Sequence, residues 1–486
     1  MKTVSCFVPI FLLILATPVW SVDIAWRDIV QVTHMPGVPM SAKIEDDGSV
    51  IHVVCHDYTG GGGPNIFYFH SLDRGYSFSD GVQLDTDSLG WAQIPSIAAN
   101  GLTVHVVYEQ HHPGWPVQVA YRRSLNGGFS WEDPVILNSD AIRPKVACEG
   151  DSVYVIYDIT DEPRHSRFRR SLNNGADWSE ETVLEPEAVN ADIVACDGIV
   201  YYVYWDTPSS IEIFLRRGLN GGDIWEDPIQ VSESPEHHSQ MPRLSVQPGG
   251  TVCVSWMDYE NSPMMWTGYI YTRTSNNYGI DWEPIQVVSE SYYCLYNDIE
   301  ICEGAIHVVF MDERYGSEHS NIHYRQSPDG GINWLPEERI CADSSQSQFP
   351  VIAAASDQVS VAWEWHQVGV CSEIFYRAGD IVNGTVFGEI PETPDVFQLL
   401  IPYPNPSNSF VIIPFISQGH GKNLTLKIVN IRGETVQHWT LGPLAPGEHA
   451  IRWDGLGSGA PVASGSYYVV LSDELMQYVR PVTLIK

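Results

Sequence analysis

Seven acidic residues in this sequence follow seven similar apolar segments, and their regular placement is the first feature that could carry chemistry. The segments read SVIHVVC, TVHVVY, SVYVIY, IVYYVYW, TVCVSW, AIHVVF and QVSVAW. Carboxylates that converge can capture a cation such as calcium, whereas a lone carboxylate can bond backbone amides of its own loop. Regularity favours the second interpretation, because a specific site breaks the symmetry of a repeat. The acids are Asp57, Glu109, Asp158, Asp206, Asp258, Asp312 and Glu364.

The loops after these acids differ from one repeat to the next, and several contain aromatic rings beside polar groups. Examples are HDYTGGGGPN, EQHHPGWPVQ, DYENSPMMWTG, DERYGSEHS and EWHQVG. An aromatic ring offers a rigid apolar surface on which a sugar ring can stack, while polar neighbours bond its hydroxyls. The sequence therefore predicts a face that binds an extracellular glycan or a surface protein. Its candidate residues are Trp115, Tyr259, Trp266, Arg314 and Trp365.

Two arginines begin other apolar segments, where they could face the centre of the fold. Arg143 stands in AIRPKVA and Arg243 in MPRLSV. No CxxC spacing suggests a metal site, so no cofactor is predicted, and a need for calcium is left open. The even count of eight cysteines after the N-terminal segment permits disulfides in an exported protein, and their pairing is left open. Cys148, Cys196 and Cys302 recur at one repeat position and are predicted to fill space in the core.

The elements that must position these residues form a repeat of about 50 residues. Six similar boxes end in an aromatic residue, from SLDRGYSF (71–78) and SLNGGFSW (124–131) to SPDGGINW (327–334), and these ends are 53, 47, 47, 57 and 52 residues apart. Each unit contains four short segments with the alternation of strands. Four-stranded units at this period predict the blades of a β-propeller.

The boxes are predicted to be structural turns. Their Asp or Asn side chain can bond turn amides, their glycine allows positive φ, and their aromatic residue can pack between sheets. The box Asp and Asn residues are Asp73, Asn126, Asn173, Asn220, Asn277 and Asp329.

Counting the second strand of each unit predicts seven blades, with six as the alternative. The last unit lacks a proper box and fourth strand, yet WRDIVQV at 26–32 closely matches WEDPIQV at 225–231. We therefore expect the N-terminal strand to complete the last blade and close the ring, which removes an open sheet edge. The fold class is all-β.

The N-terminus and the net charge place limits on location and partners. Residues 1–21 combine Lys2, an apolar run and small residues, which is typical of a signal peptide. No other run could span a bilayer, so we expect a secreted or cell-surface protein. Sixty acidic and 26 basic residues give a formal net charge of −34, which disfavours nucleic acid as a partner.

A second domain follows the propeller. Residues 22–392 form the expected propeller, and residues 393–486 begin with a Pro-rich stretch and continue with six or seven short strands, such as FVIIPFI and GSYYVVLSD. Such a series predicts a small Ig-like β-sandwich.

Both parts resemble known families. The boxes resemble the Asp-box (BNR) repeat S-x-D-x-G-x-x-W of sialidase-like propellers, which implies box turns on the face opposite the catalytic centre. The motifs YPNPSNS, PGEHAIRWDG and GAPVASGSYYVVL are similar to FlgD-type Ig-like domains and to type IX secretion sorting domains. The second resemblance implies bacterial outer-membrane export, with the secretion machinery as a partner.

Sialidases hold a substrate carboxylate with three arginines and attack with a Tyr–Glu pair. The first arginine belongs to an R-I-P motif in the first blade, where this chain reads HMPGVPMSAKI. We therefore favour a non-catalytic glycan- or protein-binding module. The alternatives are a sialidase-like glycoside hydrolase with rearranged residues and a structural or adhesive envelope component.

Overall fold

The computed structural model divides into two compact units, Met1–Thr385 and Val386–Lys486. It describes residues 21–384 apart from 36, 59–62, 86–89, 161–164, 187–188, 207–210, 234–237, 260–266, 342–345, 356 and 367–371. It also describes residues 397–484 apart from 400–409, 418–423, 431–434, 443, 445–446, 458–459 and 473–476. The expected signal peptide, apart from Ser21, and the expected boundary at 392/393 lie outside the described residues.

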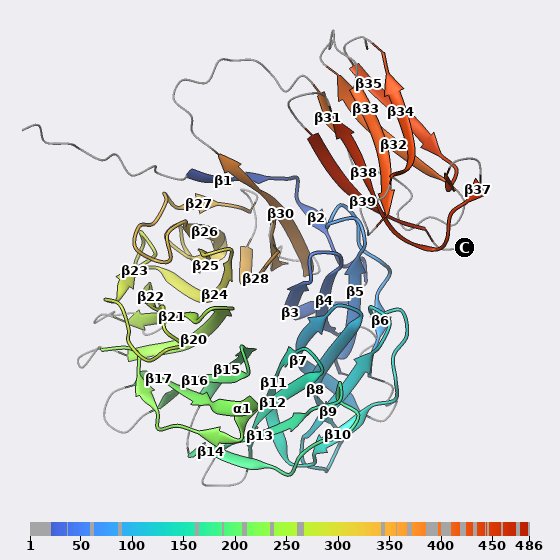
Figure 1. Ribbon diagram of the computed structural model, residues 1–486. Coiled ribbons are helices and arrows are strands. Elements are labelled where there is room, and N and C mark those ends of the chain that lie inside the picture. Colours follow the sequence, from blue (N-terminus) through green and yellow to red (C-terminus); the bar gives the residue numbers. More distant parts are fainter. Residues whose placement is uncertain are drawn as a thin grey trace, which may run out of the picture. The chain divides into compact units, whose positions relative to one another are not determined.

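The described residues of the first unit form seven antiparallel sheets (Figure 1). The first three contain β3 (Pro39–Asp46), β4 (Ile51–Asp57), β5 (Asn65–Ser71) and β6 (Val82–Gln83); β7 (Trp91–Asn100), β8 (Thr103–His111), β9 (Gln118–Ser124) and β10 (Val135–Asn138); and β11 (Ala141–Glu149), β12 (Ser152–Ile159), β13 (His165–Ser171) and β14 (Thr182–Pro186). The fourth contains β15 (Val189–Cys196), β16 (Ile199–Asp206), β17 (Glu212–Gly218), β18 (Ile224–Trp225) and β19 (Ile229–Gln230), with the one-turn helix α1 (Leu219–Gly222).

The remaining sheets follow the same order. The fifth contains β20 (His238–Gln247), β21 (Thr251–Tyr259), β22 (Tyr269–Ser275) and β23 (Gln286–Val287). The sixth contains β24 (Cys294–Cys302), β25 (Ala305–Asp312), β26 (Asn321–Ser327) and β27 (Glu338–Arg339), with the short 3-10 turn η1 (Ser317–His319). The seventh contains β28 (Gln346–Ala355), β29 (Gln358–His366) and β30 (Glu373–Gly384). In this sheet β1 (Ser21–Trp26) and β2 (Val30–Gln31) both pair with β30.

The first strand of each sheet lies at the centre of a closed ring. β3 contacts β7, and the contacts continue through β11, β15, β20 and β24 to β28, which contacts β3 again. The seven sheets are thus the blades of a β-propeller, as the repeat predicted (Figure 1). On one side of the ring, each inner strand begins, the second strand ends and the third strand begins. The pairs Ile142↔Asp158 and Asp158↔Ser166 show this for the third blade. We call this side the loop face and the opposite side, with the box turns, the box face.

The N-terminal strand closes the ring, which confirms the sequence-based prediction. β1 pairs with β30 from Ser21↔Gly384 to Trp26↔Gly379, and β2 pairs with the same strand at Val30↔Tyr376. The Trp26 ring contacts Tyr324 of the preceding blade edge-on at 4.9 Å, and its Nε1 donates to Glu338 at 2.9 Å. Trp131 and Trp178 likewise contact a tyrosine of the preceding blade edge-on, Tyr68 and Tyr121 respectively.

The box turns are internally bonded, as predicted. In the box of residues 124–131, the amide of Gly128 donates to Ser124 Oγ at 2.9 Å and the amide of Ser130 donates to Asn126 Oδ1 at 2.9 Å. Equivalent bonds reach Asp73, Asn173, Asn277 and Asp329. The box of Asn220 differs, because Gly218 replaces the serine and Asn220 itself has φ of 53° within α1.

The box glycines also let neighbouring blades approach each other. Gly128 has φ of 87°, and a Cβ there would overlap the Tyr68 hydroxyl of the preceding blade. That tyrosine in turn bonds the Nδ1 of His52 at 2.7 Å, and the pairs His105–Tyr121 and His307–Tyr324 repeat the arrangement. Burial lowers the pKa of both His105 and His307 to about 4, so these histidines are neutral structural links at physiological pH.

Arginines on the third strands of the second to seventh blades tie each of these blades to the one before it. Arg273 donates from Nε to the carbonyl of Glu283 in its own blade and from Nη1 to Val231 of the preceding blade, both at 2.9 Å. At the closure, Arg377 bonds the carbonyls of Arg27 at 2.6 Å and Ile340 at 2.9 Å. The same pair of contacts is made by Arg122, Arg169, Arg216 and Arg325.

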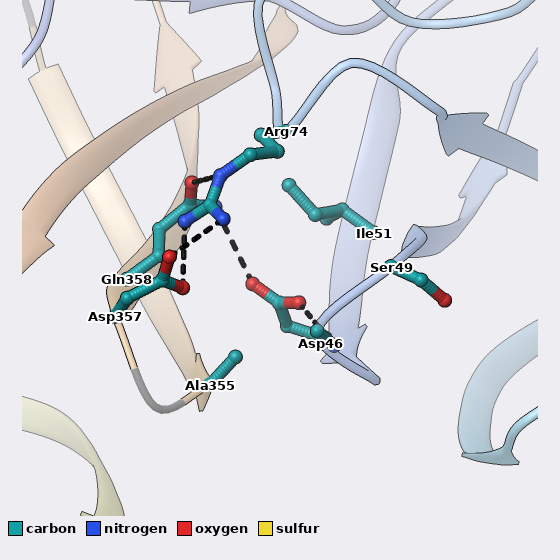
Figure 2. A pocket seen from close by; sticks show the side chains of 8 residues that line it. Asp46, Ser49, Ile51, Arg74, Ala355, Asp357 and Gln358 are labelled. Atoms are coloured by element: carbon teal, nitrogen blue, oxygen red, sulfur yellow. Dashed lines mark hydrogen bonds and ion pairs between the residues drawn. The ribbon is translucent and has the colours of Figure 1, made fainter. Parts of the chain in front are cut away.

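A small pocket on the box face lies where the first and last blades meet (Figure 2). Arg74 bonds both oxygens of Asp357 at 2.7 and 2.8 Å and Gln358 Oε1 at 3.2 Å. Arg27 donates to the Arg74 carbonyl at 2.7 Å. The polar groups of the pocket bond one another, so we assign it to the ring closure.

The second unit is a sandwich of two sheets, as predicted. One sheet contains β31 (Phe397–Leu399), β32 (Val411–Ser417) and β35 (Gly447–Trp453), and the other contains β34 (Thr435–Leu441), β33 (Leu424–Asn430), β38 (Gly465–Ser472) and β39 (Gln477–Leu484). A short ribbon pairs β36 (Leu456–Gly457) with β37 (Ala460–Pro461). Ile413, Leu426 and Trp453 share one buried core, in which the Trp453 Nε1 donates to the Leu456 carbonyl at 2.8 Å.

The ring closure yields a test by Trp26→Ala. This change removes the edge-on contact with Tyr324 and the bond to Glu338, so we expect the free energy of unfolding to fall by about 2–3 kcal/mol. Denaturant unfolding measures the effect, with Trp115→Ala as the control. Trp115 is 69% exposed, so its loss should change stability by no more than about 0.5 kcal/mol. Equal effects of both changes would contradict the proposed role of Trp26.

Candidate ligand-binding face

Each inner strand begins at the loop face with a bulge, and this bulge sets where its side chains point. The register shifts once in every blade, as between Ile142 and Lys145. In each bulge one residue adopts positive φ, a conformation uncommon outside glycine that clusters at functional sites. These residues are Ser41, Ile94, Arg143, Asn190, Met241, Tyr296 and Phe349.

Most of the seven acids are buried at the loop face, so they do not form an exposed rim for a cation. The acids Asp57, Glu109, Asp158, Asp258, Asp312 and Glu364 are buried, and Asp206 is half-buried. Asp312 caps its own loop, because its Oδ1 accepts the amide of Arg314 at 2.6 Å. Asp158 accepts the Ser166 hydroxyl at 2.7 Å, and Asp258 accepts that of Ser239 at 3.3 Å.

Two of these acids bond the next blade, which the capping interpretation did not anticipate. Glu109 accepts the amide of Arg143 at 2.8 Å, and Glu364 accepts the amide of Ser41 at 2.6 Å. Both donors are the positive-φ residues of their bulges. The acids therefore hold the bulges in place and link blades, and this role leaves their charge committed to the protein.

The two candidate arginines lie in different layers of the ring. Arg143 is itself a bulge residue, and its Nη1 lies 3.9 Å from Asp158. Arg243 comes two residues after the bulge at Met241, and its Nε lies 3.8 Å from Asp298. Because they occupy different repeat positions and pair with different acids, the structure does not bring Arg143 and Arg243 together into one carboxylate clamp.

Aromatic residues are grouped on the loop face of the first two blades. Trp91 stacks on His111 with ring centroids 5.3 Å apart, and His112 lies 6.3 Å from Trp115. Trp115 is exposed. The first blade adds Tyr58, which is also exposed and contacts His56 edge-on. A Cβ on Gly63 would overlap Trp91, so the loop of the first blade reaches the aromatic residues of the second. We call Tyr58, Trp91, His111, His112 and Trp115 the aromatic surface.

Tyrosines of the fifth and sixth blades are held as neutral phenols. Burial raises the pKa of Tyr259 to about 12, with nearby Tyr296 adding to the shift. Burial also raises the pKa of Tyr296, followed by the charges of Glu313 and Glu364. Tyr259 donates to Gln240 at 3.2 Å, and Tyr296 packs on Phe349 at 4.4 Å. Both shifts oppose a phenolate nucleophile.

The other candidates of the loop face have structural contacts. Arg314 bonds Asp312 at 2.7 Å and also pairs with Glu337, whose Oε1 lies 2.7 Å from His323 Nδ1. This network fixes the loop that carries η1. Trp365 is half-buried and contacts Phe375 at 5.3 Å. Trp266 lies outside the described residues.

Charged side chains gather at the ring centre, and sequence reasoning missed all of them except Arg243. The residues two positions after the bulges are Lys43, Ser96, Lys145, Asp192, Arg243, Asp298 and Val351, and Glu45 and Glu300 follow two positions later. Burial and then the Asp298 charge raise the pKa of Glu300 to about 8. Burial and then Glu300 raise the pKa of Glu45 well above its usual range.

A possible metal cluster on the box face serves as a turn cap. Glu149, Cys196 and Asp197 come within 4.8 Å of one another, but both Glu149 oxygens accept the amide of Gly198, at 3.0 and 3.3 Å. The seven cysteines that the structure describes are all free, and five of them are buried.

Comparison with known proteins identifies part of the second domain. Residues 418–475 match the family model of the FlgD Ig-like domain. No curated protein matches the chain. Within the described residues, no helix has the length and apolar character needed to cross a membrane.

Several solved structures are similar to the chain. A protein of unknown function from Dyadobacter fermentans is 11% identical, with 74% of this chain and 99% of the other covered and a TM-score of 0.50. Trypanosoma rangeli sialidase with the inhibitor DANA is 9% identical, and the match covers 92% of this chain and 85% of the sialidase, with a TM-score of 0.45. Penicillium chrysogenum α-L-arabinanase with arabinobiose is 13% identical, and the match covers 59% of this chain and 92% of the arabinanase, with a TM-score of 0.42. Such likeness concerns the fold alone.

The raised pKa of Glu300 makes stability depend on pH in a defined direction. Between pH 4.5 and 8 the native carboxyl keeps a proton that the unfolded chain has released, so wild-type stability contains a contribution that falls as pH rises through this range. Glu300→Gln removes this pH-dependent contribution, because glutamine does not titrate. We expect similar unfolding free energies for both proteins near pH 4.5, and a variant more stable by on the order of 1 kcal/mol at pH 8.5.

Urea unfolding at the two pH values measures this difference. Glu318→Gln, at an exposed position in η1, controls for the loss of one carboxylate. A Glu300→Gln effect of the same size at both pH values would show that this carboxyl is not held protonated in the native ring.

Proposed function

We propose that this protein is a secreted or cell-surface propeller that binds a carbohydrate through its aromatic surface. The observation that carries the proposal is the pairing of exposed Trp115 and Tyr58 with histidines on two adjacent blades. Exposed aromatic rings beside hydrogen-bonding groups match the two demands of a sugar, whose ring faces are apolar and whose edge is polar.

Charge narrows the class of ligand. The chain carries a formal net charge of −34, which repels polyanions at long range. A neutral glycan, or a glycan on a basic surface protein, suits the aromatic surface better than nucleic acid or an anionic membrane. The side chains that meet there are rings and imidazoles, with Glu109 already engaged by His111 at 2.9 Å.

The second domain supports delivery to the cell exterior. Its match to the FlgD Ig-like domain agrees with the resemblance of its motifs to type IX secretion sorting domains. Together with the signal-peptide pattern of residues 1–21, this favours export through the outer membrane of a bacterium, with the secretion machinery as the partner of the second domain.

The contacts of the loop face favour a binding module over a hydrolase. Arg143 and Arg243 lie in different layers, and the pKa values of Tyr259 and Tyr296 are raised. Hydrolysis by a tyrosine nucleophile requires the reverse shift. A sialidase-like activity therefore requires residues other than these, and fluorogenic glycosides test it directly. Turnover of a sialoside that Arg143→Ala abolishes would replace the binding proposal.

A glycan array tests the binding proposal with two matched variants of the full-length protein. Trp115→Ala removes an exposed ring from the aromatic surface, whereas Phe129→Ala removes an equally exposed ring from the box face. We expect Trp115→Ala to weaken glycan binding at least about tenfold, the loss typical of a central aromatic anchor. Phe129→Ala should bind as the wild type does.

The two variants also separate the remaining alternatives. Equal binding by both variants would place the ligand elsewhere on the propeller. Binding by neither the variants nor the wild type, to any glycan on the array, would favour the structural or adhesive role.

A further inference from the structure

The distribution of lysines in the first domain is unusual. Residues 22–392 contain only two, Lys43 and Lys145. Both occupy the same repeat position, two residues after the bulges at Ser41 and Arg143, on the inner strands β3 and β11. Arg243 occupies this position on β20. Three cations thus project from the first, third and fifth blades at one level of the ring centre.

The largest single charge interaction on each lysine comes from another cation. After burial, which lowers the pKa of Lys145 to about 7, its largest charge interactions are with Lys43 and Arg243. Burial also lowers the pKa of Lys43, and its largest charge interaction is with Arg243. Asp192 and Asp298 act on both lysines less strongly. Each lysine is therefore influenced more by another cation than by any carboxylate.

Asp298, one of the two acids at this level, already has other partners. Asp298 lies 3.8 Å from Arg243 Nε and also accepts the amide of Ile352 at 3.1 Å. The causes of the pKa shifts of Lys43 and Lys145 are burial and the charges of described neighbours, and no hydrogen bond to a described side chain is among them. Half-buried ammonium groups that face one another without hydrogen-bond acceptors are unfavourable unless an anion lies between them.

We propose that the ring centre binds a small oxyanion, a carboxylate, sulfate or phosphate group, between Lys43, Lys145 and Arg243. The guanidinium offers a planar fork to two oxygens, and each ammonium contributes a point charge. The site is separate from the aromatic surface, so it goes beyond the proposed carbohydrate binding and can fail independently of it.

Protonation is coupled to this binding. A bound anion stabilises the charged lysines and raises their pKa, so binding takes up protons and weakens as pH rises. If only the protonated form of Lys145 binds, its occupancy of about 0.9 at pH 6 and about 0.03 at pH 8.5 predicts an affinity about thirtyfold lower at the higher pH. Glu300 at the ring centre, whose pKa is about 8, ionises over the same range and weakens the binding of an anion further. Sulfate is the suitable probe, because its own charge is constant over this range.

Isothermal titration of the full-length protein with sodium sulfate, against sodium chloride at equal ionic strength, tests the proposal at both pH values. We expect saturable binding of sulfate at pH 6, a loss of at least about thirtyfold at pH 8.5, and loss of binding in Lys145→Met and Arg243→Met. Lys427→Met, in the second domain, is the matched control and should bind normally. Parallel titrations with phosphate and acetate distinguish the class of oxyanion.

Selective labelling gives a second readout that needs no variant. Reductive methylation at pH 7 modifies amines in their neutral form, so Lys145 should react faster than Lys427, and sulfate should protect Lys145 and Lys43 but not Lys427. Mass spectrometry of peptides reports both rates. The proposal is overturned if sulfate binds no better than chloride at pH 6, if Lys145→Met binds as the wild type does, or if sulfate leaves Lys145 labelling unchanged.

Discussion

The structure of the first domain depends on contact between each blade and the one before it. A four-stranded blade has two apolar faces and cannot bury either of them alone, so the blades are stable only as neighbours. The box aromatic packs against a ring of the preceding blade, the box glycine gives that ring room, and an arginine bonds carbonyls on both sides. Closure repeats these contacts with Trp26 and Arg377, although Trp26 is separated from its blade by the whole propeller sequence.

This closure turns sequence positions into layers around one axis. Residues at the same place in seven repeats face one another at the ring centre, so a charge at that position meets up to six others. The repeat is followed closely where blades touch, as at the box turns and the third-strand arginines. It is broken at the ring centre by Lys43 and Lys145, and at the loop face by Trp115 and Tyr58. The two proposed sites lie where the repeat is broken, since a ligand without sevenfold symmetry needs a surface that lacks it.

The acidic residues at the ends of the second strands show how far sequence reasoning extends into the candidate site. Their regularity argued for a structural role, and Asp312 caps its own loop. The bonds of Glu109 and Glu364 to bulge amides of the next blade could not be predicted, because strand alternation does not reveal a bulge. The same bulge separates Arg143 from the layer of Arg243. The scarcity of lysine was visible in the sequence, but its meaning required knowing that both lysines share one repeat position.

The sequence by itself determined the repeat, the four-stranded unit, the role of the box turns, the strand that closes the ring and the sandwich that follows. These features depend on local alternation, turn chemistry and spacing, which are encoded within short stretches of chain. Only the tertiary structure decided which side chains meet: the aromatic surface of two blades, the acids that hold neighbouring bulges and the cations at the ring centre. Those contacts join residues from separate blades, and their geometry exists only after the ring has closed.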